Sequence, residues 1–351
     1  MPENIYEFSF AELQQRLLEL GEPTYRARQI WRNLYQGLKT SFDEMTDLPQ
    51  TLRTQLGQEM NIGSLKLMAQ ARSQDGGTHK LLLALSDDHQ IETVLMMYRQ
   101  RRTACISTQA GCAMGCVFCA TGQMGFERNL TIGEIVEQVL WCARNLQGAG
   151  ERLTNVVVMG MGEPFHNYDA TLAALDRLND PVGFDFGARR FTISTVGLIP
   201  AIERFSSEQR QFNLAVSLHA ATDALRAELL PLNKRYPLQE LISACKEYVN
   251  STGRRITFEW ALIHDVNDST EQARALTILL KGMRCHVNVI PLNPTNDYMG
   301  AASSRERAQA FRDILETAHI PCTIRIRRGI DISAGCGQLR VQVDQASLSP
   351  V

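Results

Sequence analysis

The sequence predicts an α/β protein: a parallel sheet core preceded by a small helical domain and a β-hairpin. Three observations support this fold class. Short apolar segments alternate with amphipathic helical ones from about residue 101, the first 60 residues are helical in pattern throughout, and two strand-like segments lie between these regions. Strands that alternate with helices form a parallel sheet with right-handed crossovers. We therefore expect the loops at the carboxyl ends of the strands to carry the active site.

Residues 1–60 are predicted to form a helical N-terminal domain. Apolar residues recur at helical spacing over 10–20, 24–38 and 49–60, and breakers separate these segments. The domain is acidic overall, with six Lys or Arg against nine Asp or Glu. Its second helix nevertheless mixes basic with aromatic side chains: Tyr25, Arg26, Arg28, Trp31, Arg32 and Tyr35.

Residues 61–100 are expected to form a β-hairpin extension, and residues 101–345 the core. The hairpin strands are 79–85 and 91–98, joined by the polar turn SDDHQ. The predicted core strands are 103–108, 155–160, 190–197, 212–219, 255–263 and 286–293, with a last strand at 322–328. The predicted core helices are 131–146, 169–178, 237–249, 269–283 and 304–318.

Composition limits the compartment and the class of protein. The 351 residues carry a formal net charge of −2, which does not indicate a nucleic-acid binder, although a near-neutral chain can still hold a basic face. The polar, acidic start does not resemble a signal peptide, and no apolar stretch approaches the roughly 20 residues that span a bilayer. We therefore expect a soluble, cytoplasmic monomer whose nine cysteines are thiols or metal ligands.

The segment CAMGCVFC contains the densest group of candidate ligands, Cys112, Cys116 and Cys119, in the loop after the first core strand. Three thiolates can hold three irons of a cuboidal 4Fe–4S cluster and leave the fourth iron open for catalysis. The alternative is a structural zinc site, which needs four ligands. No fourth Cys or His lies nearby, because His79 and His89 are upstream beyond a strand. This spacing favours the cluster.

C-x3-C-x2-C in the first loop of a (βα)6 chain resembles the radical-SAM superfamily, and the resemblance covers residues 101–345. It implies a partial TIM-like barrel. It also implies that S-adenosylmethionine (SAM) binds the open iron through its amino and carboxylate groups, and that one-electron reduction cleaves it to methionine and a 5′-deoxyadenosyl radical.

Polar residues at the ends of the other strands are candidate SAM contacts. The GMGEP turn at 160–164 follows the second strand, where Gly162 allows close approach of the backbone and Glu163 can accept hydrogen bonds from an ammonium group. Tight strand–helix packing explains such a turn equally well, but its place in a radical-SAM chain resembles the segment that binds the methionyl amino group. Further candidates close later strands: Ser194, Ser217, Leu218, His219 and Asn293.

Two cysteines outside the cluster motif are candidate catalytic residues. Cys336 lies between two glycines in a polar loop, which is not a packing environment. Exposed thiols near basic side chains such as Arg327 and Arg328 can have lowered pKa values and act as nucleophiles. Cys105 lies in the strand just before the cluster motif. The remaining four are expected to pack in the core: Cys142, Cys245, Cys285 and Cys322.

Motifs spread over essentially the whole chain resemble the RlmN/Cfr family of RNA methyltransferases, and RlmN more closely than Cfr. One of them is a cysteine, Cys105, seven residues before the first cluster ligand. The others are IETVLM at 91–96, CVFCATG at 116–122, GFERNLT at 125–131 and DISAGCGQL at 331–339.

The resemblance implies a mechanism that uses two SAM molecules per turnover. Cys336 takes a methyl group from the first SAM and becomes S-methylcysteine. The radical from the second SAM removes hydrogen from this methyl, and the resulting methylene radical adds to the adenine ring. After electron loss and proton abstraction, Cys105 attacks the sulfur of Cys336, releases the RNA and leaves a transient disulfide. Glu92 matches the proposed general base; from its sequence context alone it would be a solvated strand residue.

The implied substrates are an adenosine of 23S rRNA, methylated at C2, and tRNA, with a flavodoxin or ferredoxin system as electron donor. Two alternatives remain at this stage: Cfr-like methylation at C8, and a zinc-stapled RNA-binding module without catalysis. The target base must be unstacked to expose its ring carbons. Basic residues that could hold RNA phosphates are the N-terminal arginines together with Arg99, Arg101, Arg102, Arg325, Arg327 and Arg328.

Overall fold

A computed structural model of the chain describes residues 2–340, so the end of the predicted core, residues 341–345, lies outside the described residues. Ten strands in the described part form one mixed sheet, and seven of them are parallel neighbours. In spatial order these are β6 (Arg102–Cys105), β9 (Asn155–Val158), β10 (Phe191–Thr195), β11 (Asn213–Ser217), β12 (Ile256–Leu262), β13 (Cys285–Pro291) and β14 (Cys322–Ile324). The predicted strand–helix alternation is confirmed.

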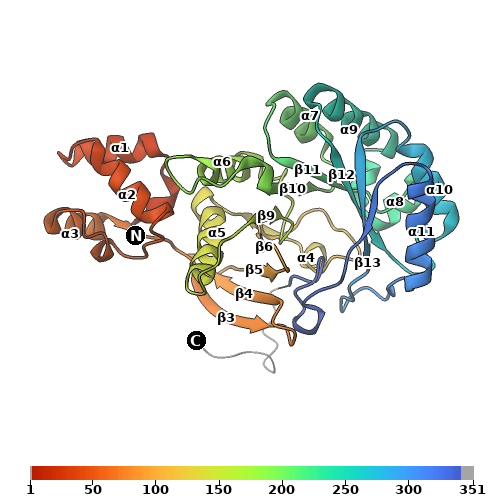
Figure 1. Ribbon diagram of the computed structural model, residues 1–351, viewed down its shortest axis with the longest axis horizontal. Coiled ribbons are helices and arrows are strands. Elements are labelled where there is room, and N and C mark those ends of the chain that lie inside the picture. The colour runs from red at the N-terminus through yellow and green to blue at the C-terminus, as the bar shows by residue number, and fades with distance from the viewer. Residues whose placement is uncertain (1, 341–351) are drawn as a thin grey trace.

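Helices cover the outside of this sheet (Figure 1). The longest, α5 (Ile132–Gln147), begins at a capping box in which Thr131 and Glu134 satisfy each other's backbone N–H groups. The other core helices are α6 (Tyr168–Asn179), α7 (Ile199–Ser207), α8 (Asp223–Leu229), α9 (Leu238–Thr252), α10 (Thr270–Leu279) and α11 (Arg305–Thr317). The sequence patterns did not predict α7 and α8, which are the shortest of these.

Three antiparallel strands extend the sheet beyond β6: β5 (Gln90–Met97), β4 (Thr78–Ala84) and β3 (Lys66–Arg72). The predicted hairpin corresponds to β4 and β5, whereas β3 was missed. The strand order runs from β14 at one edge to β3 at the other. The two free edges show that the sheet is not a closed barrel, which is consistent with the partial barrel that the radical-SAM resemblance implied.

The N-terminal residues form the expected helices α1 (Phe10–Glu19), α2 (Tyr25–Tyr35) and α3 (Gln50–Glu59). Two short strands, β1 (Glu3–Asn4) and β2 (Met60–Asn61), pair in parallel and bring the two ends of this segment together. The helices lie at one end of the molecule (Figure 1). Trp31 of α2 docks at the end of α6, where its indole donates to Asp180 (3.0 Å). The turn at Ile5–Glu7, before α1, docks on α5, where Arg144 donates to the Tyr6 hydroxyl (2.8 Å).

Short elements shape the segment between β6 and α5: β7 (Gln109–Gly111), α4 (Ala120–Gln123) and β8 (Phe126–Asn129). β7 and β8 pair as a separate two-stranded ribbon, and the candidate cluster cysteines lie between them. None of the helices in residues 2–340 combines the length and apolar character that crossing a membrane requires.

Candidate active site

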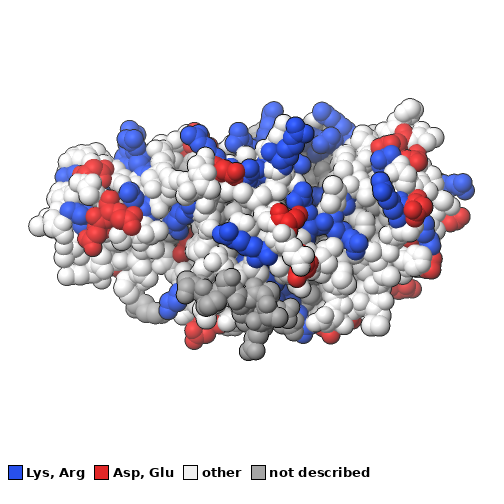
Figure 2. Space-filling view, turned by 60° about the horizontal axis from the view of Figure 1, so that its bottom comes forward, with Lys and Arg blue, Asp and Glu red and all other residues white. Residues whose placement is uncertain are grey.

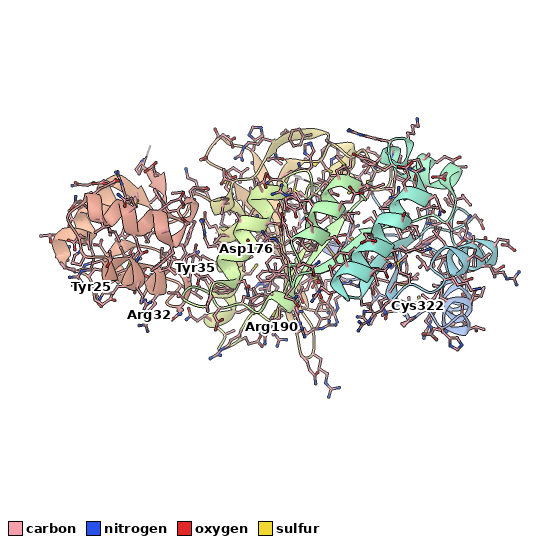
Figure 3. The ribbon with its side chains drawn as sticks, turned by 90° about the horizontal axis from the view of Figure 1, so that it is seen from above. Tyr25, Arg32, Tyr35, Asp176, Arg190 and Cys322 are labelled. Atoms are coloured by element: carbon pink, nitrogen blue, oxygen red, sulfur yellow. The ribbon has the colours of Figure 1, made fainter. Side chains whose placement is uncertain are left out.

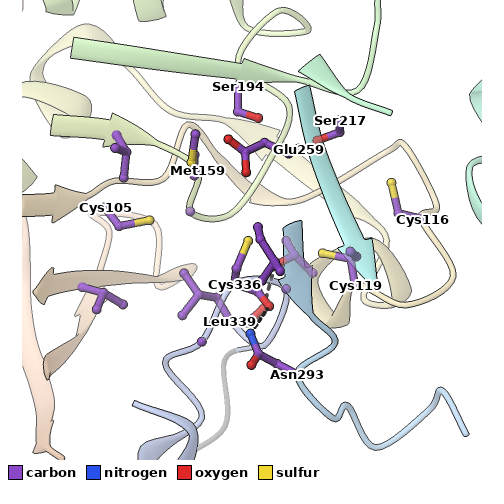
Figure 4. Close-up of a pocket in the computed structure, with 18 of the residues that line it drawn as sticks. Cys105, Cys116, Cys119, Met159, Ser194, Ser217, Glu259, Asn293, Cys336 and Leu339 are labelled. Carbon is purple, nitrogen blue, oxygen red and sulfur yellow. Dashed lines mark hydrogen bonds between the residues drawn. The ribbon is translucent and has the colours of Figure 1, made fainter. Parts of the chain in front are cut away.

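A cavity of about 220 Å³ opens at the carboxyl ends of the parallel strands. It contains eleven of the thirteen candidate residues, which come from segments more than 200 positions apart in the chain (Figure 4). They are Cys105, Cys112, Cys116, Cys119, Gly162, Glu163, Ser194, Ser217, His219, Asn293 and Cys336. The other two, Glu92 and Leu218, do not line it; Leu218 is fully buried in the core.

The cluster loop is held in shape by its own backbone and by the loop of Cys336. The N–H of Cys112 donates to the carbonyl of Gly125 (2.7 Å), and the N–H of Cys119 donates to that of Cys116 (3.1 Å). Gly115 has a φ of +63°, a left-handed conformation that favours glycine, so the chain can turn between the first two cysteines. The three thiols therefore face one cavity although they are spread over eight residues.

The donor set fits an iron–sulfur cluster better than a single zinc ion. Three thiolates on one tetrahedral zinc, with Zn–S bonds of about 2.3 Å, lie roughly 3.8 Å apart. Within residues 2–340, the group of three candidate ligands with all donor atoms within 4.8 Å of one another is His264, Asp265 and Asp268, not the cysteines. Three thiolates of one loop can each bind a different iron of such a cluster. In the His264 group, Arg307 already pairs with both carboxylates, at 2.5 and 2.6 Å.

The turn after β9 packs tightly against β6 and the segment that follows it. Gly162 has a φ of +96°, and a Cβ there would lie 2.8 Å from the backbone nitrogen of Gln109. Glu163 is buried, and its two carboxylate oxygens accept the N–H groups of Phe165 (3.0 Å) and Val196 (2.8 Å). Burial raises the pKa of Glu163 to about 7. The glycine is thus required for packing, and the same turn presents Glu163 to the cavity.

Two of the strand-end residues are fixed by hydrogen bonds. The Nδ1 atom of His219 accepts the N–H of Ala261 (2.8 Å), and burial lowers the pKa of this histidine to about 3, so the ring is neutral. Asn293 donates to the carbonyl of Cys336 (3.0 Å). Ser194 and Ser217 close neighbouring strands and point toward the same space (Figure 4). Their assignment to SAM stays a prediction.

Cys105 and Cys336 face the same cavity, beside the cluster loop (Figure 4). Cys105 is buried, whereas Cys336 is solvent-accessible from within the cavity. The loop of Cys336 is attached to the cluster segment, because the N–H of Ala120 donates to the carbonyl of Gly337 (2.8 Å). Both cysteines are free thiols, and the other four cysteines are buried as expected.

The pKa of Cys336 is raised, not lowered. Burial, and next the charge of Glu259, raise its pKa to about 11, and the opposing effect of Arg325 is smaller. Sequence proximity to Arg327 and Arg328 did not show that the thiol is enclosed beside a carboxylate.

Glu92 is not a solvated strand residue. It is 1% exposed and forms an ion pair with Lys80 (2.9 Å), and its other oxygen accepts the N–H of Arg340 (3.0 Å). Burial raises its pKa to about 7 although Lys80 opposes the shift. This is a suitable pKa for a general base, but the carboxylate lies outside the cavity lining, so the catalytic role stays a prediction.

Sequence reasoning missed Glu259, which lies in β12 and lines the cavity. It is in register with Ser217 on one side and with Asn288 on the other, and Asn288 donates to it (2.8 Å). The available signal was a charged residue inside an otherwise apolar strand, FEWALI. A buried carboxylate in such a strand indicates a polar barrel interior.

Comparisons with known proteins agree with this site. Residues 106–277 match the Radical SAM superfamily, and residues 3–62 match the "Ribosomal RNA large subunit methyltransferase N-terminal domain". A Myxococcus xanthus protein named "Dual-specificity RNA methyltransferase RlmN 1" is 52% identical, covering 98% of this chain and 96% of its own. A Chloroflexus aurantiacus protein named "Probable dual-specificity RNA methyltransferase RlmN" is 47% identical, covering 95% and 92%.

A solved structure of similar size has the same fold. It is a radical SAM methyltransferase from Sphaerobacter thermophilus with 51% sequence identity and a TM-score of 0.95, and the match covers 97% of this chain and 100% of that one. The identity is at this level over nearly the full length of the chain. The chain therefore belongs to the radical SAM superfamily and, within it, to the RlmN family.

Proposed function

We propose that this protein methylates C2 of an adenosine in 23S rRNA and of an adenosine in tRNA, through an S-methylcysteine at Cys336. One observation carries the proposal: Cys105 and Cys336, 231 positions apart, line one cavity together with three cysteines suited to a 4Fe–4S cluster. A methyltransferase that passes the methyl group directly from SAM to its substrate does not need this combination. Two free thiols beside a radical source are suited to two tasks: one thiol carries the methyl group covalently, and the second thiol releases the methylated product.

The cluster is assigned to Cys112, Cys116 and Cys119, and SAM to the turn of Gly162 and Glu163 with the strand-end residues. When bound, these groups supply one-electron cleavage of SAM and a carbon-centred radical that removes hydrogen from a methyl group. The protein encloses this chemistry, because many of the lining residues are apolar and come from β5, β9, the cluster loop and the ends of β12 and β13. They include Val94, Met96, Val157, Val158, Met114, Phe118, Ala261, Ile290 and Leu292.

Cys336 carries the methyl group because its sulfur is accessible inside the cavity while its backbone is held by Asn293. After the adenine is attached, the carrier sulfur must be separated from the new methyl group. Cys105 faces the same space and can attack that sulfur, which leaves a disulfide that a cellular thiol reductant resets. This requirement supports a reducing, cytoplasmic compartment.

RNA reaches the cavity past a group of arginines. Arg325, Arg327 and Arg328 line it, and the Tyr98 ring lies beneath the guanidinium groups of Arg328 (4.8 Å) and Arg101 (5.3 Å). Figure 2 shows Lys and Arg side chains gathered over the middle of one face, although the chain is near neutral overall. Such a face supports binding to phosphates. Domain 1–60, with exposed Arg28 and Arg32, is proposed as a second RNA contact.

We expect a flavodoxin or ferredoxin type of electron donor and a monomeric enzyme. The relatives named above are RlmN proteins rather than Cfr proteins, which favours C2 over C8. The match of residues 106–277 to the Radical SAM superfamily argues against the zinc-stapled binding module.

The proposal is tested by anaerobic reconstitution with iron and sulfide, followed by incubation with SAM, a one-electron reductant and an rRNA fragment or tRNA. Mass spectrometry of the digested RNA, with synthetic standards, separates 2-methyladenosine from 8-methyladenosine. We expect 2-methyladenosine and 5′-deoxyadenosine. 8-Methyladenosine would replace the C2 assignment with C8. A protein that binds RNA and holds one zinc, but yields no 5′-deoxyadenosine, would refute the enzyme assignment.

A further inference from the structure

Arg226 is a fully buried cation that the proposed mechanism does not use. It lies on α8, none of its surface is exposed, and it is the most deeply buried Lys or Arg in the described residues. Its guanidinium donates to the carbonyls of Val196 (2.7 Å), Ser217 (3.2 Å) and Leu218 (3.2 Å), and to the side-chain oxygen of Asn233 (2.9 Å). All four acceptors are neutral.

No carboxylate in residues 2–340 lies within ion-pair distance, 4.0 Å, of this guanidinium. The acid connected to it is Asp223, through Asn233: the amide of Asn233 donates to Asp223 (2.8 Å) while its oxygen accepts from Arg226. Asp223 is exposed and also accepts the N–H of Leu238 (2.7 Å). A buried charge without a partner is strongly unfavourable. Residues 2–340 therefore offset this charge with neutral acceptors and, through Asn233, with the exposed Asp223, but with no direct ion pair.

The missing negative charge is expected on the side of the cluster loop. The N–H of Val117 donates to the carbonyl of Leu229, the last residue of α8 (3.1 Å). Phe118 of the loop and Leu229 belong to the same small apolar cluster, which also contacts Cys116. Burial lowers the pKa of Arg226, and the groups that oppose this shift are, in order, Cys116, Cys245 of α9 and Asp223. Arg226 is thus placed behind the cluster loop, shielded from water.

We propose that Arg226 provides the buried positive charge that stabilises the reduced cluster held by Cys112, Cys116 and Cys119. Three thiolates give the loaded site a net negative charge, and reduction adds one electron from an external one-electron donor without making or breaking a bond. A fixed cation nearby favours the more negative state, so the reduction potential rises. The inference rests on the cluster assignment and not on which RNA base is methylated.

A purely structural role predicts a different result. Arg226 also ties the ends of β10 and β11 to α8, so its loss would lower stability whatever its effect on the cluster. Stability and iron content therefore cannot test the proposal by themselves. The reduction potential can, because a structural crosslink does not change it while the cluster remains intact.

The first experiment compares Arg226→Gln with Arg226→Lys after anaerobic reconstitution, without SAM or RNA. The midpoint potential is measured by a mediated titration followed by electron paramagnetic resonance. At a fixed potential we expect Arg226→Gln to lower the ratio of reduced to oxidised cluster at least about tenfold, which is roughly 59 mV for one electron. Arg226→Lys keeps the charge and should stay close to wild type.

The second experiment keeps Arg226 and moves a negative charge onto it. The double variant Asp223→Asn with Asn233→Asp exchanges the carboxylate and the amide of the relay, so composition and net charge do not change. The carboxylate then lies where Arg226 now contacts a neutral oxygen, and we expect a lower potential than in wild type. Asp223→Asn alone is the control, because it removes an exposed carboxylate and leaves the Arg226 contact neutral; its potential should not fall.

The outcomes are distinct. The proposal is overturned if Arg226→Gln holds a full cluster at the wild-type potential. If Arg226→Gln does not fold, the double variant Asp223→Asn with Asn233→Asp decides. A wild-type reduction potential in the double variant also overturns the proposal, and a lowered potential supports it. A protein that assembles no cluster even as wild type would refute the cluster assignment, and RNA methylation is not needed for any of these readings.

Discussion

The chemistry proposed here depends on two sulfur atoms whose surroundings differ. Cys105 is buried at the end of β6, and Cys336 is accessible in a loop that is tied to the cluster segment and to Asn293. Burial raises the pKa of both thiols, that of Cys105 to about 12. Neither thiol is therefore reactive by default, and each is expected to act only when a bound electrophile lies beside it.

Cys105→Ala should trap the enzyme on its product. Its task in the proposed mechanism is to break the bond between Cys336 and the modified base, so methylation of Cys336 and radical attack should continue. Protein purified from cells should then carry covalently attached RNA, detected on denaturing gels as a band that nuclease treatment shifts. Cys336→Ala should carry none, and the double variant should behave like Cys336→Ala.

Cys322→Ala provides a matched control for this experiment, since Cys322 is buried and does not line the cavity. It should lose a modest amount of stability, about 1–2 kcal/mol, without any crosslink. Wild-type turnover by Cys105→Ala, with no attached RNA, would contradict the role given to Cys105.

Replacing any one of Cys112, Cys116 and Cys119 with Ala should abolish the cluster, because each thiolate holds one iron and no spare cysteine lies in the loop. Iron and sulfide content after reconstitution, and 5′-deoxyadenosine formation under reduction, measure the loss. Cys285→Ala, at a buried position in β13, should keep both. Stoichiometric iron with 5′-deoxyadenosine formation in a cluster variant would show that the ligands were misassigned.

At the scale of secondary-structure elements, α5 connects the N-terminal domain to the barrel. Glu137, in the middle of this helix, is 4% exposed and accepts the backbone N–H groups of Ser64 (2.8 Å) and Leu65 (3.2 Å) at the start of the hairpin region. Burial raises the pKa of Glu137 to about 7 in spite of these hydrogen bonds. The helix thus holds the linker through a carboxyl group that titrates near neutral pH.

Glu137→Gln should change how stability depends on pH. Between pH 4.5 and about 7 the unfolded wild type has released this proton and the folded protein has not, so the free energy of unfolding falls as the pH rises. Glutamine does not titrate. The difference in the free energy of unfolding, variant minus wild type, should therefore rise between pH 4.5 and about 7 by on the order of 3 kcal/mol. Above this range the difference should stay constant. Urea denaturation at several pH values measures the difference, and a flat or falling difference would be inconsistent with the buried carboxyl.

At the scale of the whole molecule, the N-terminal helices lie at one end and the candidate active-site cavity lies at the carboxyl ends of the parallel strands. Tyr25 and Arg32 project from these helices (Figure 3), and Arg28 is also exposed. Removing residues 1–60 is expected to spare the cluster and weaken RNA turnover, but it would also uncover the faces of α5 and α6 on which the domain docks. Charge reversal is the cleaner test.

Arg28→Glu combined with Arg32→Glu should weaken tRNA binding about tenfold and reduce its salt dependence, since two phosphate contacts are lost. Cluster content should not change, because every cluster ligand lies beyond residue 100. Fluorescence anisotropy across a salt series measures both effects. The matched control is Lys246→Glu with Lys281→Glu, two exposed lysines on and after helices at the opposite end of the molecule. Equal effects from the two pairs would exclude a specific role for the domain.

Local sequence patterns predicted much of this protein. The spacing of Cys112, Cys116 and Cys119 indicated the cluster, because three ligands in one loop need only a short chain to meet. The alternation of strands and helices predicted the parallel core, since periodicity reflects which face of each element is buried. The candidate residues at strand ends followed from that reading, because parallel strands deliver their carboxyl ends to one edge of a sheet.

What the sequence did not reveal depends on contacts between distant segments. β3 was missed because it is an edge strand with a mixed, partly exposed pattern, and its pairing with β4 fixes it. Glu92 is buried beside Lys80 because their strands pair in the sheet. The pairing of β12 with β11 likewise brings Glu259 to the cavity. Arg226 is enclosed only when α8 packs behind the cluster loop. Local periodicity carries no information on which elements meet, so the tertiary structure decides which charges lose contact with water.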